Sequence, residues 1–172
     1  MYMKMKRLVA AIFLATTVEG GVFAQSITQS LNDGWSFSDN QVKWKAVALP
    51  HTWNTDAYET SAYKQGKCSY KRILRLPIET NKRYFLKLEA ANKTSTIYIN
   101  GKKVGEHRGG YTASVADLTP FLRRAKSLDD CSNEILITVD NADRHVAPIS
   151  ADFTFMGGIY RNVKLITTNL QH

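Results

Sequence analysis

Apolar and polar residues alternate along the chain in short runs, and this two-residue period is typical of β-strands that bury one face. Leu86 and Leu88 flank a lysine, and Ile97 and Ile99 flank a tyrosine. Almost no stretch has apolar residues at the spacing of an amphipathic helix. The pattern predicts strands over residues 44–49, 69–76, 83–89, 94–99, 134–139 and 160–167.

Turn residues separate these runs. Asn100-Gly101 ends the run 94–99, and this pair predicts a tight hairpin, because both central residues must take positive φ. Gly109-Gly110 and Gly157-Gly158 indicate two further places where the backbone excludes a Cβ. Residues 117–122 predict a loop and one helical turn, with Thr119 as its cap and Pro120 as its first residue.

Six to eight strands in a chain of this size favour two packed sheets, since a single open sheet would leave an apolar face in water. We therefore predict an all-β fold, a jelly-roll or related β-sandwich. Trp35 and Trp44 are expected in its core.

The first 24 residues have the three parts of an export signal. Lys4, Lys6 and Arg7 precede an apolar run over residues 8–15, and small residues lead to a cleavage site after Ala24. The apolar run is much shorter than the roughly 20 residues of a membrane span. We predict a signal peptide over 1–24, no membrane association after its removal, and a periplasmic or extracellular location. A buried N-terminal helix is the alternative.

Residues 25–172 then amount to a single domain by size, which we place at 25–170. They carry 20 basic and 14 acidic residues, a formal net charge of +6 compared with +8 for the whole chain. The charges lie in separate segments, so a solvated surface is favoured over a nucleic-acid site. Cys68 and Cys131 could pair after export or remain thiols. Their spacing predicts neither a metal site nor a cofactor.

The residues offer little for catalysis. Glycosidic hydrolysis usually needs two opposed carboxyl groups, and the mature chain has only five glutamates. Glu134 follows Asn133 but leads directly into an apolar strand run, and no serine lies in a nucleophile-elbow motif. We therefore assign no catalytic residue. Aromatic residues suited to stacking on sugars lie in the polar stretch 50–66, namely Trp53, Tyr58 and Tyr63.

Five segments, taken in order, resemble the N-terminal sugar-binding domain of glycoside hydrolase family 2, and the third and fifth look most like its β-galactosidase-type branch. The similarity covers about residues 28–170. The segments are 49–54, 97–101, 104–112 followed by 117–119, 133–141, and 151–161.

The resemblance implies a galactose-binding-domain-like jelly roll. It also implies that an immunoglobulin-like domain and a (β/α)₈ barrel with both catalytic glutamates follow this domain in the family. These domains and a β-galactoside-like carbohydrate are therefore the expected partners. The family would have an aromatic-rich stretch where Cys68 stands and a further aromatic residue in the region 114–116.

The resemblance also suggests site residues. Asp152 corresponds to the family's aspartate that reaches the active site and contacts sugar hydroxyls; a structural carboxylate paired with Arg161 is the alternative. His51, Trp53 and Asn54 belong to a matching loop and are candidates for lining the substrate side of the domain interface.

Three hypotheses follow. The first is a carbohydrate-binding and bracing domain of a glycosidase, truncated before the barrel and inactive alone. The second is a stand-alone module that binds glycans through Trp53, Tyr58 and Asp152. The third is an inactive remnant.

Overall fold

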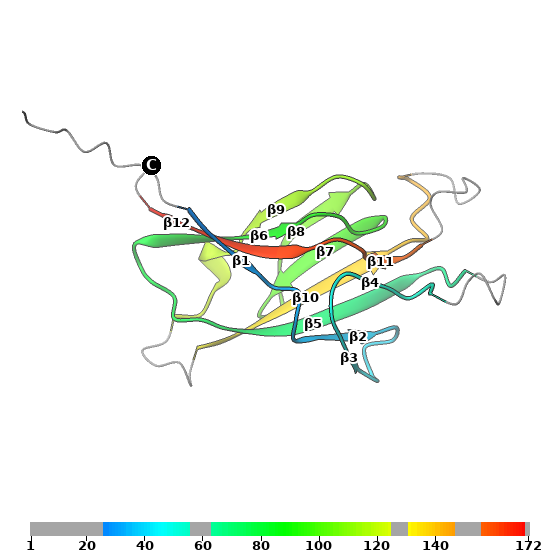
Figure 1. Cartoon of the computed structure of the whole chain (residues 1–172), viewed down its shortest axis with the longest axis horizontal. Helices are drawn as coiled ribbons and strands as arrows, with labels where there is room; N and C mark the ends of the chain where they lie inside the picture. The colour runs from blue at the N-terminus through cyan, green and yellow to red at the C-terminus, as the bar shows by residue number, and fades with distance from the viewer. Residues whose placement is uncertain (1–25, 56–62, 125–130, 147–155, 171–172) are drawn as a thin grey trace, which may run out of the picture.

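The computed structural model describes residues 26–55, 63–124, 131–146 and 156–170, and these residues form an all-β structure (Figure 1). Within them one 3₁₀ turn, η1 (Thr119–Phe121), interrupts the strands. The strands are β1 (Ser26–Ser30), β2 (Trp35–Ser38), β3 (Lys45–Val47), β4 (His51–Thr52), β5 (Lys67–Arg75), β6 (Lys82–Leu88), β7 (Thr94–Ile99), β8 (Lys102–Arg108), β9 (Ser114–Asp117), β10 (Ser132–Asp140), β11 (Gly158–Ile159) and β12 (Val163–Asn169).

The strands form two main antiparallel sheets. One has four strands in the order β1-β12-β6-β9, and the other has six in the order β3-β2-β5-β10-β7-β8. A third, two-stranded sheet joins β11 to β4 at one end (Figure 1). Neighbouring strands are distant in sequence, because β1 pairs with β12 and β5 with β10.

The hydrophobic core lies between the two sheets. Leu86 and Leu88 of β6 contribute from the four-stranded sheet, while Ile135 and Ile137 of β10 contribute from the six-stranded sheet. All four side chains are at most 1% exposed. The predicted inward faces and the β-sandwich are confirmed.

The predicted hairpin is also confirmed. Asn100 and Gly101 connect β7 to β8 with φ values of 51° and 80°. The predicted helical turn exists as η1 (Thr119–Phe121), but Thr119 is not its cap. Leu118 occupies the cap position without a side-chain hydrogen bond. Thr119 Oγ1 instead accepts a hydrogen bond from the Tyr84 backbone nitrogen at 2.9 Å.

One of the two tryptophans expected in the core lies outside it. Trp44 is half-buried at the surface, with Lys71 Nζ 4.3 Å from its ring, so it is not a core residue. Trp35 is a core residue, with 1% exposure.

The two cysteines are too far apart to pair. Cys68 lies opposite Val139 in the β5–β10 pairing, whereas Cys131 precedes the first residue of β10. The eight positions from Cys131 to Val139 span about 26 Å along a strand, which is far beyond the reach of a disulfide. Both cysteines are buried thiols.

Candidate functional site

Residues 51–54, the loop predicted to line the domain interface, pair with the segment that follows residues 147–155. In the β4–β11 pairing, Thr52 lies opposite Gly158 and His51 opposite Ile159. Thr52 Oγ1 donates a hydrogen bond to the Gly157 carbonyl at 2.8 Å, and the Trp53 backbone nitrogen donates to the same oxygen at 3.2 Å. We call residues 51–54 together with 156–159 the clasp. It holds the backbone of residues 157–159, which follow the segment that contains Asp152 in the sequence.

Glycine is required on one side of the clasp. A Cβ at Gly157 would lie 2.0 Å from Trp53 Cζ2, and a Cβ at Gly158 would lie 2.3 Å from the His51 carbonyl oxygen. Gly158 also has a φ of 141°. The predicted exclusion of a Cβ at this pair is therefore confirmed, and it allows the Trp53 indole to approach the backbone directly. The Trp53 ring also stacks on Phe37, with centroids 5.9 Å apart.

Asn54 connects three segments through its buried amide. Its Oδ1 accepts a hydrogen bond from the Gly157 nitrogen at 2.7 Å, and its Nδ2 donates to the Lys64 carbonyl at 3.2 Å. Trp53 Nε1 and Asn141 Nδ2 donate to the same carbonyl at 3.1 and 3.0 Å. Three side chains therefore hold the backbone at residue 64 against the clasp.

His51 is held by aromatic neighbours. Its Nδ1 lies 2.8 Å from the Tyr70 hydroxyl, and its ring packs 4.9 Å from Phe37 and 5.6 Å from Tyr70, measured between centroids. Burial, reinforced by the positive charge of Lys45, lowers the pKa of His51. Burial likewise raises the pKa of Tyr70. At neutral pH a neutral imidazole therefore faces a protonated hydroxyl.

The structure brings three of the four predicted substrate-binding residues together. His51, Trp53 and Asn54 share the clasp, and each has internal hydrogen-bond partners. Asp152 lies outside the described residues, as does Tyr58. Contact of these residues with sugar stays a prediction.

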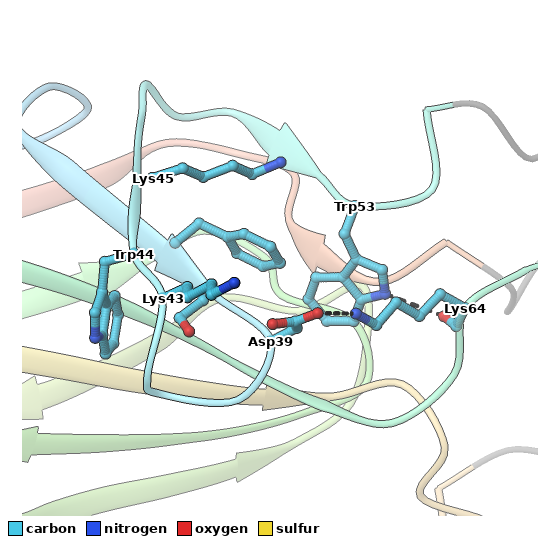
Figure 2. A pocket seen from close by; sticks show the side chains of 8 residues that line it. Asp39, Lys43, Trp44, Lys45, Trp53 and Lys64 are labelled. Carbon is cyan, nitrogen blue, oxygen red and sulfur yellow. Dashed lines mark hydrogen bonds and ion pairs between the residues drawn. The ribbon is translucent and has the colours of Figure 1, made fainter.

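A groove beside the clasp was not foreseen from the sequence. It has a volume of about 330 Å³. Figure 2 shows Trp53, from the clasp, beside Asp39 and Lys64, with Lys45 and Trp44 further along. Its lining residues are Phe37, Ser38, Asp39, Lys43, Trp44, Lys45, Trp53 and Lys64.

The groove is polar at its rim. Lys64 Nζ lies 2.6 Å from Asp39 Oδ2, and this hydrogen bond and charge lower the pKa of the Asp39 carboxyl. Lys45 Nζ lies 5.3 Å from the centre of the Phe37 ring. These lysines look scattered in the sequence because they come from different segments. The run Lys43-Trp44-Lys45 was the one local signal, and the β2–β3 hairpin turns it toward Lys64.

Other kinds of site receive no support within the described ranges. No group of three or more His, Cys, Asp or Glu residues there could hold a metal ion. In the same residues, no helix has the length and apolarity needed to cross a membrane. Glu79, Glu89 and Glu106 are each within 3.0 Å of a basic side chain.

A family model described as glycosyl hydrolases family 2, sugar binding domain, matches residues 22–169. The chain belongs to this family. A β-glucuronidase of Bacteroides fragilis is 36% identical over 146 residues, which are 81% of this chain and 20% of that protein. A β-galactosidase of Thermoanaerobacter pseudethanolicus is 29% identical over 154 residues, covering 85% and 20%.

Solved structures of the family agree with the fold. The structure of Bacteroides uniformis β-glucuronidase 2 covalently bound to cyclophellitol-6-carboxylate aziridine has a TM-score of 0.75 and 47% identity to this chain. The match covers 83% of this chain and 18% of that one. The chain thus spans about a fifth of the length of the family 2 proteins that it matches, and the predicted family resemblance is confirmed.

Proposed function

We propose that this family 2 sugar-binding domain braces the catalytic part of a glycosidase and presents residues 147–155, with Asp152, to the substrate pocket. The substrate class is a β-glucuronide or a β-galactoside, the two activities named among the relatives. The domain has no hydrolytic role by itself in this proposal, because family 2 activity depends on parts that lie in the other four-fifths of such proteins.

The clasp is the observation that carries this proposal. The Gly157 carbonyl accepts hydrogen bonds from Thr52 and Trp53, and the Gly157 nitrogen donates one to Asn54 Oδ1. On the other side of residues 147–155, Asp143 Oδ2 accepts a hydrogen bond from Thr94 Oγ1 at 2.6 Å. A carboxylate can accept hydrogen bonds from two sugar hydroxyls at once, and this is the role that the proposal gives to Asp152.

A domain exchange tests the proposal. Residues 26–170 would replace the matching segment of B. uniformis β-glucuronidase 2, and hydrolysis of nitrophenyl β-glucuronide and β-galactoside would be measured. We expect the chimera to keep the host's preference. In the chimera, Asp152→Asn should lower kcat/KM by roughly 10- to 100-fold, the effect of weakening charged hydrogen bonds.

Asp33→Asn is the matched control, because it removes the same charge from an exposed position outside the clasp. It should leave kcat/KM within about twofold. Equal activity of the Asp152→Asn chimera and the parent chimera would refute the role of Asp152. A folded chimera whose two variants lose activity equally would also refute it.

A titration separates bracing from stand-alone glycan binding. The purified chain is titrated with methyl β-galactoside, and bracing predicts no measurable heat up to millimolar sugar, since most contacts would come from the barrel. A dissociation constant below about 1 mM would instead support the stand-alone module.

We further propose export to the periplasm or the outside of the cell, on the strength of the N-terminal basic and apolar pattern. Expression in a Gram-negative host followed by N-terminal sequencing of the periplasmic protein should give a chain that starts at Gln25. An uncleaved cytoplasmic product would contradict export.

A further inference from the structure

The groove of Figure 2 has an excess of positive charge that the proposed function does not use. Lys43, Lys45 and Lys64 line it, and Asp39 is the single acidic residue among the described residues of its lining. Asp39 is already bonded to Lys64 at 2.6 Å. Within the described part of the chain, Lys43 and Lys45 have no carboxylate oxygen within 4.0 Å of their Nζ atoms.

The positive charge of Lys45 acts on two groups beside the groove, the exposed Asp39 carboxyl and the half-buried His51 ring. The charge of Lys45 contributes to the lowered pKa values of both Asp39 and His51, behind the larger effects of the Lys64 hydrogen bond and of burial. Two exposed lysines without a carboxylate partner among the described residues therefore line a concave surface that favours an anion.

Aromatic rings provide the rest of the groove. Trp44 and Trp53 are both half-buried, so part of each side chain remains accessible, and Phe37 lies beneath with 6% exposure. Lys71, whose Nζ lies 4.3 Å from the Trp44 ring, does not line the groove. A volume of about 330 Å³ falls in the range of small-molecule sites.

We propose that this groove binds an acidic saccharide, with the carboxylate of a uronic acid residue at Lys43 and Lys45 and the C–H face of a sugar ring on Trp53. The aromatic surface favours a sugar over a small inorganic anion, and the two lysines favour a charged sugar over a neutral one. This site lies entirely within the chain and does not depend on the proposed role of Asp152.

Nuclear magnetic resonance of the purified, ¹⁵N-labelled chain offers a direct readout, because the sequence has only three tryptophans. Trp35 Nε1 is buried and donates to the Leu31 carbonyl, so its indole signal is an internal reference. Titration with trigalacturonate should move the Trp53 indole signal and leave that of Trp35 in place. The shifts should weaken when NaCl is raised from about 50 to about 500 mM.

Matched ligands and variants isolate the contribution of charge to saccharide binding. Methyl-esterified trigalacturonate has the same rings without charge, and it should bind at least tenfold more weakly than the acid. The double variant Lys43→Gln, Lys45→Gln should weaken trigalacturonate binding by roughly tenfold or more. Lys102→Gln, an exposed lysine in the β7–β8 hairpin, should have no effect.

Each other outcome overturns the proposal. Equal binding of acid and ester would remove the role of charge, and equal shifts with sodium sulfate would show an anion site without sugar recognition. Loss of binding in Lys102→Gln as large as in the double variant would mean non-specific attraction. No shift at about 10 mM trigalacturonate, with the unliganded spectrum showing a folded protein, would mean that the groove binds no such saccharide.

Discussion

Gly157 lies where no side chain fits, since its Cβ would be 2.0 Å from Trp53 Cζ2. Trp53 cannot move away easily, because Phe37 stacks on it and its Nε1 is bonded to the Lys64 carbonyl. We therefore predict that Gly157→Ala lowers the free energy of unfolding by about 1–3 kcal/mol, the usual cost of overpacking. Urea denaturation followed by tryptophan fluorescence measures it.

Gly105→Ala is the matched control for this substitution. A Cβ at Gly105 would be 3.6 Å from Ala116 Cβ, which is ordinary van der Waals contact. Its free energy of unfolding should stay within about 0.5 kcal/mol of the parent. Equal effects of the two substitutions would show that the close approach at the clasp is not what requires glycine.

Cys68 should be an unreactive thiol in the folded protein. Burial, the dominant cause, raises its pKa to about 11, so little thiolate exists at pH 8. We predict that iodoacetamide at pH 8 labels Cys68 at least tenfold more slowly in the native chain than in guanidinium chloride, as followed by mass spectrometry of the peptides. Rapid native labelling of Cys68 would contradict the burial that the structure shows.

At the scale of single elements, the β7–β8 hairpin depends on more than its turn geometry. Asn100 Nδ2 donates to the Asn133 Oδ1 at 2.8 Å and to the Phe121 carbonyl at 3.1 Å, and its Oδ1 accepts from the Glu134 nitrogen at 3.0 Å. Asn100→Gly keeps positive φ but removes these three bonds. We predict a loss of about 1–3 kcal/mol in the free energy of unfolding, measured by urea denaturation.

Gly101→Asn provides the comparison for the hairpin. Gly101 has φ 80°, no atom lies within 4 Å of the position that a Cβ would take there, and asparagine tolerates this region of φ. The substitution should cost less than about 1 kcal/mol. If Gly101→Asn proves more damaging than Asn100→Gly, backbone conformation rather than the side-chain network governs the hairpin.

Sequence alternation predicted those strands whose inward faces are aliphatic. β7 was predicted at its observed bounds, and β6, β10 and β12 were predicted within three residues at each end. β1 was missed because all five of its residues are exposed and it is held by pairing with β12. A strand without a buried face gives no periodic signal, and the partner that holds it is more than 130 residues away along the chain.

At the scale of the whole molecule, only the parts of the site that local sequence motifs mark were predictable. The paired glycines and the loop 51–54 were visible as local motifs, and the structure joins them in the clasp. The groove could not be predicted, because it depends on how the β2–β3 hairpin folds back toward Lys64, which lies 19 residues after Lys45. The expectation that Trp44 lies in the core was wrong for the same reason, because its surroundings also depend on how this hairpin folds.

The whole molecule should lose stability in two stages as the pH falls. Burial lowers the pKa of His51 below its ordinary 6.5, so the unfolded chain binds this proton more readily than the folded chain. Its contribution is complete above pH 6.5 and decreases below it. The carboxyls of Asp39, Glu89 and Glu106 have pKa values lowered by lysine or arginine partners, from ordinary values of 3.8 or 4.5. Their contribution is complete above about pH 4.5 and is lost below it.

Urea midpoints measured from pH 8 to pH 3 separate the two stages. In the parent chain the midpoint should fall between pH 7 and 5 and again below pH 4.5, whereas His51→Gln should remove the first decline and leave the second. The second should be smaller in about 1 M NaCl, because the ion pairs at Asp39, Glu89 and Glu106 are at least partly exposed to solvent and are screened by salt. An identical decline between pH 7 and 5 in both proteins would mean that a group other than His51 takes up the first proton.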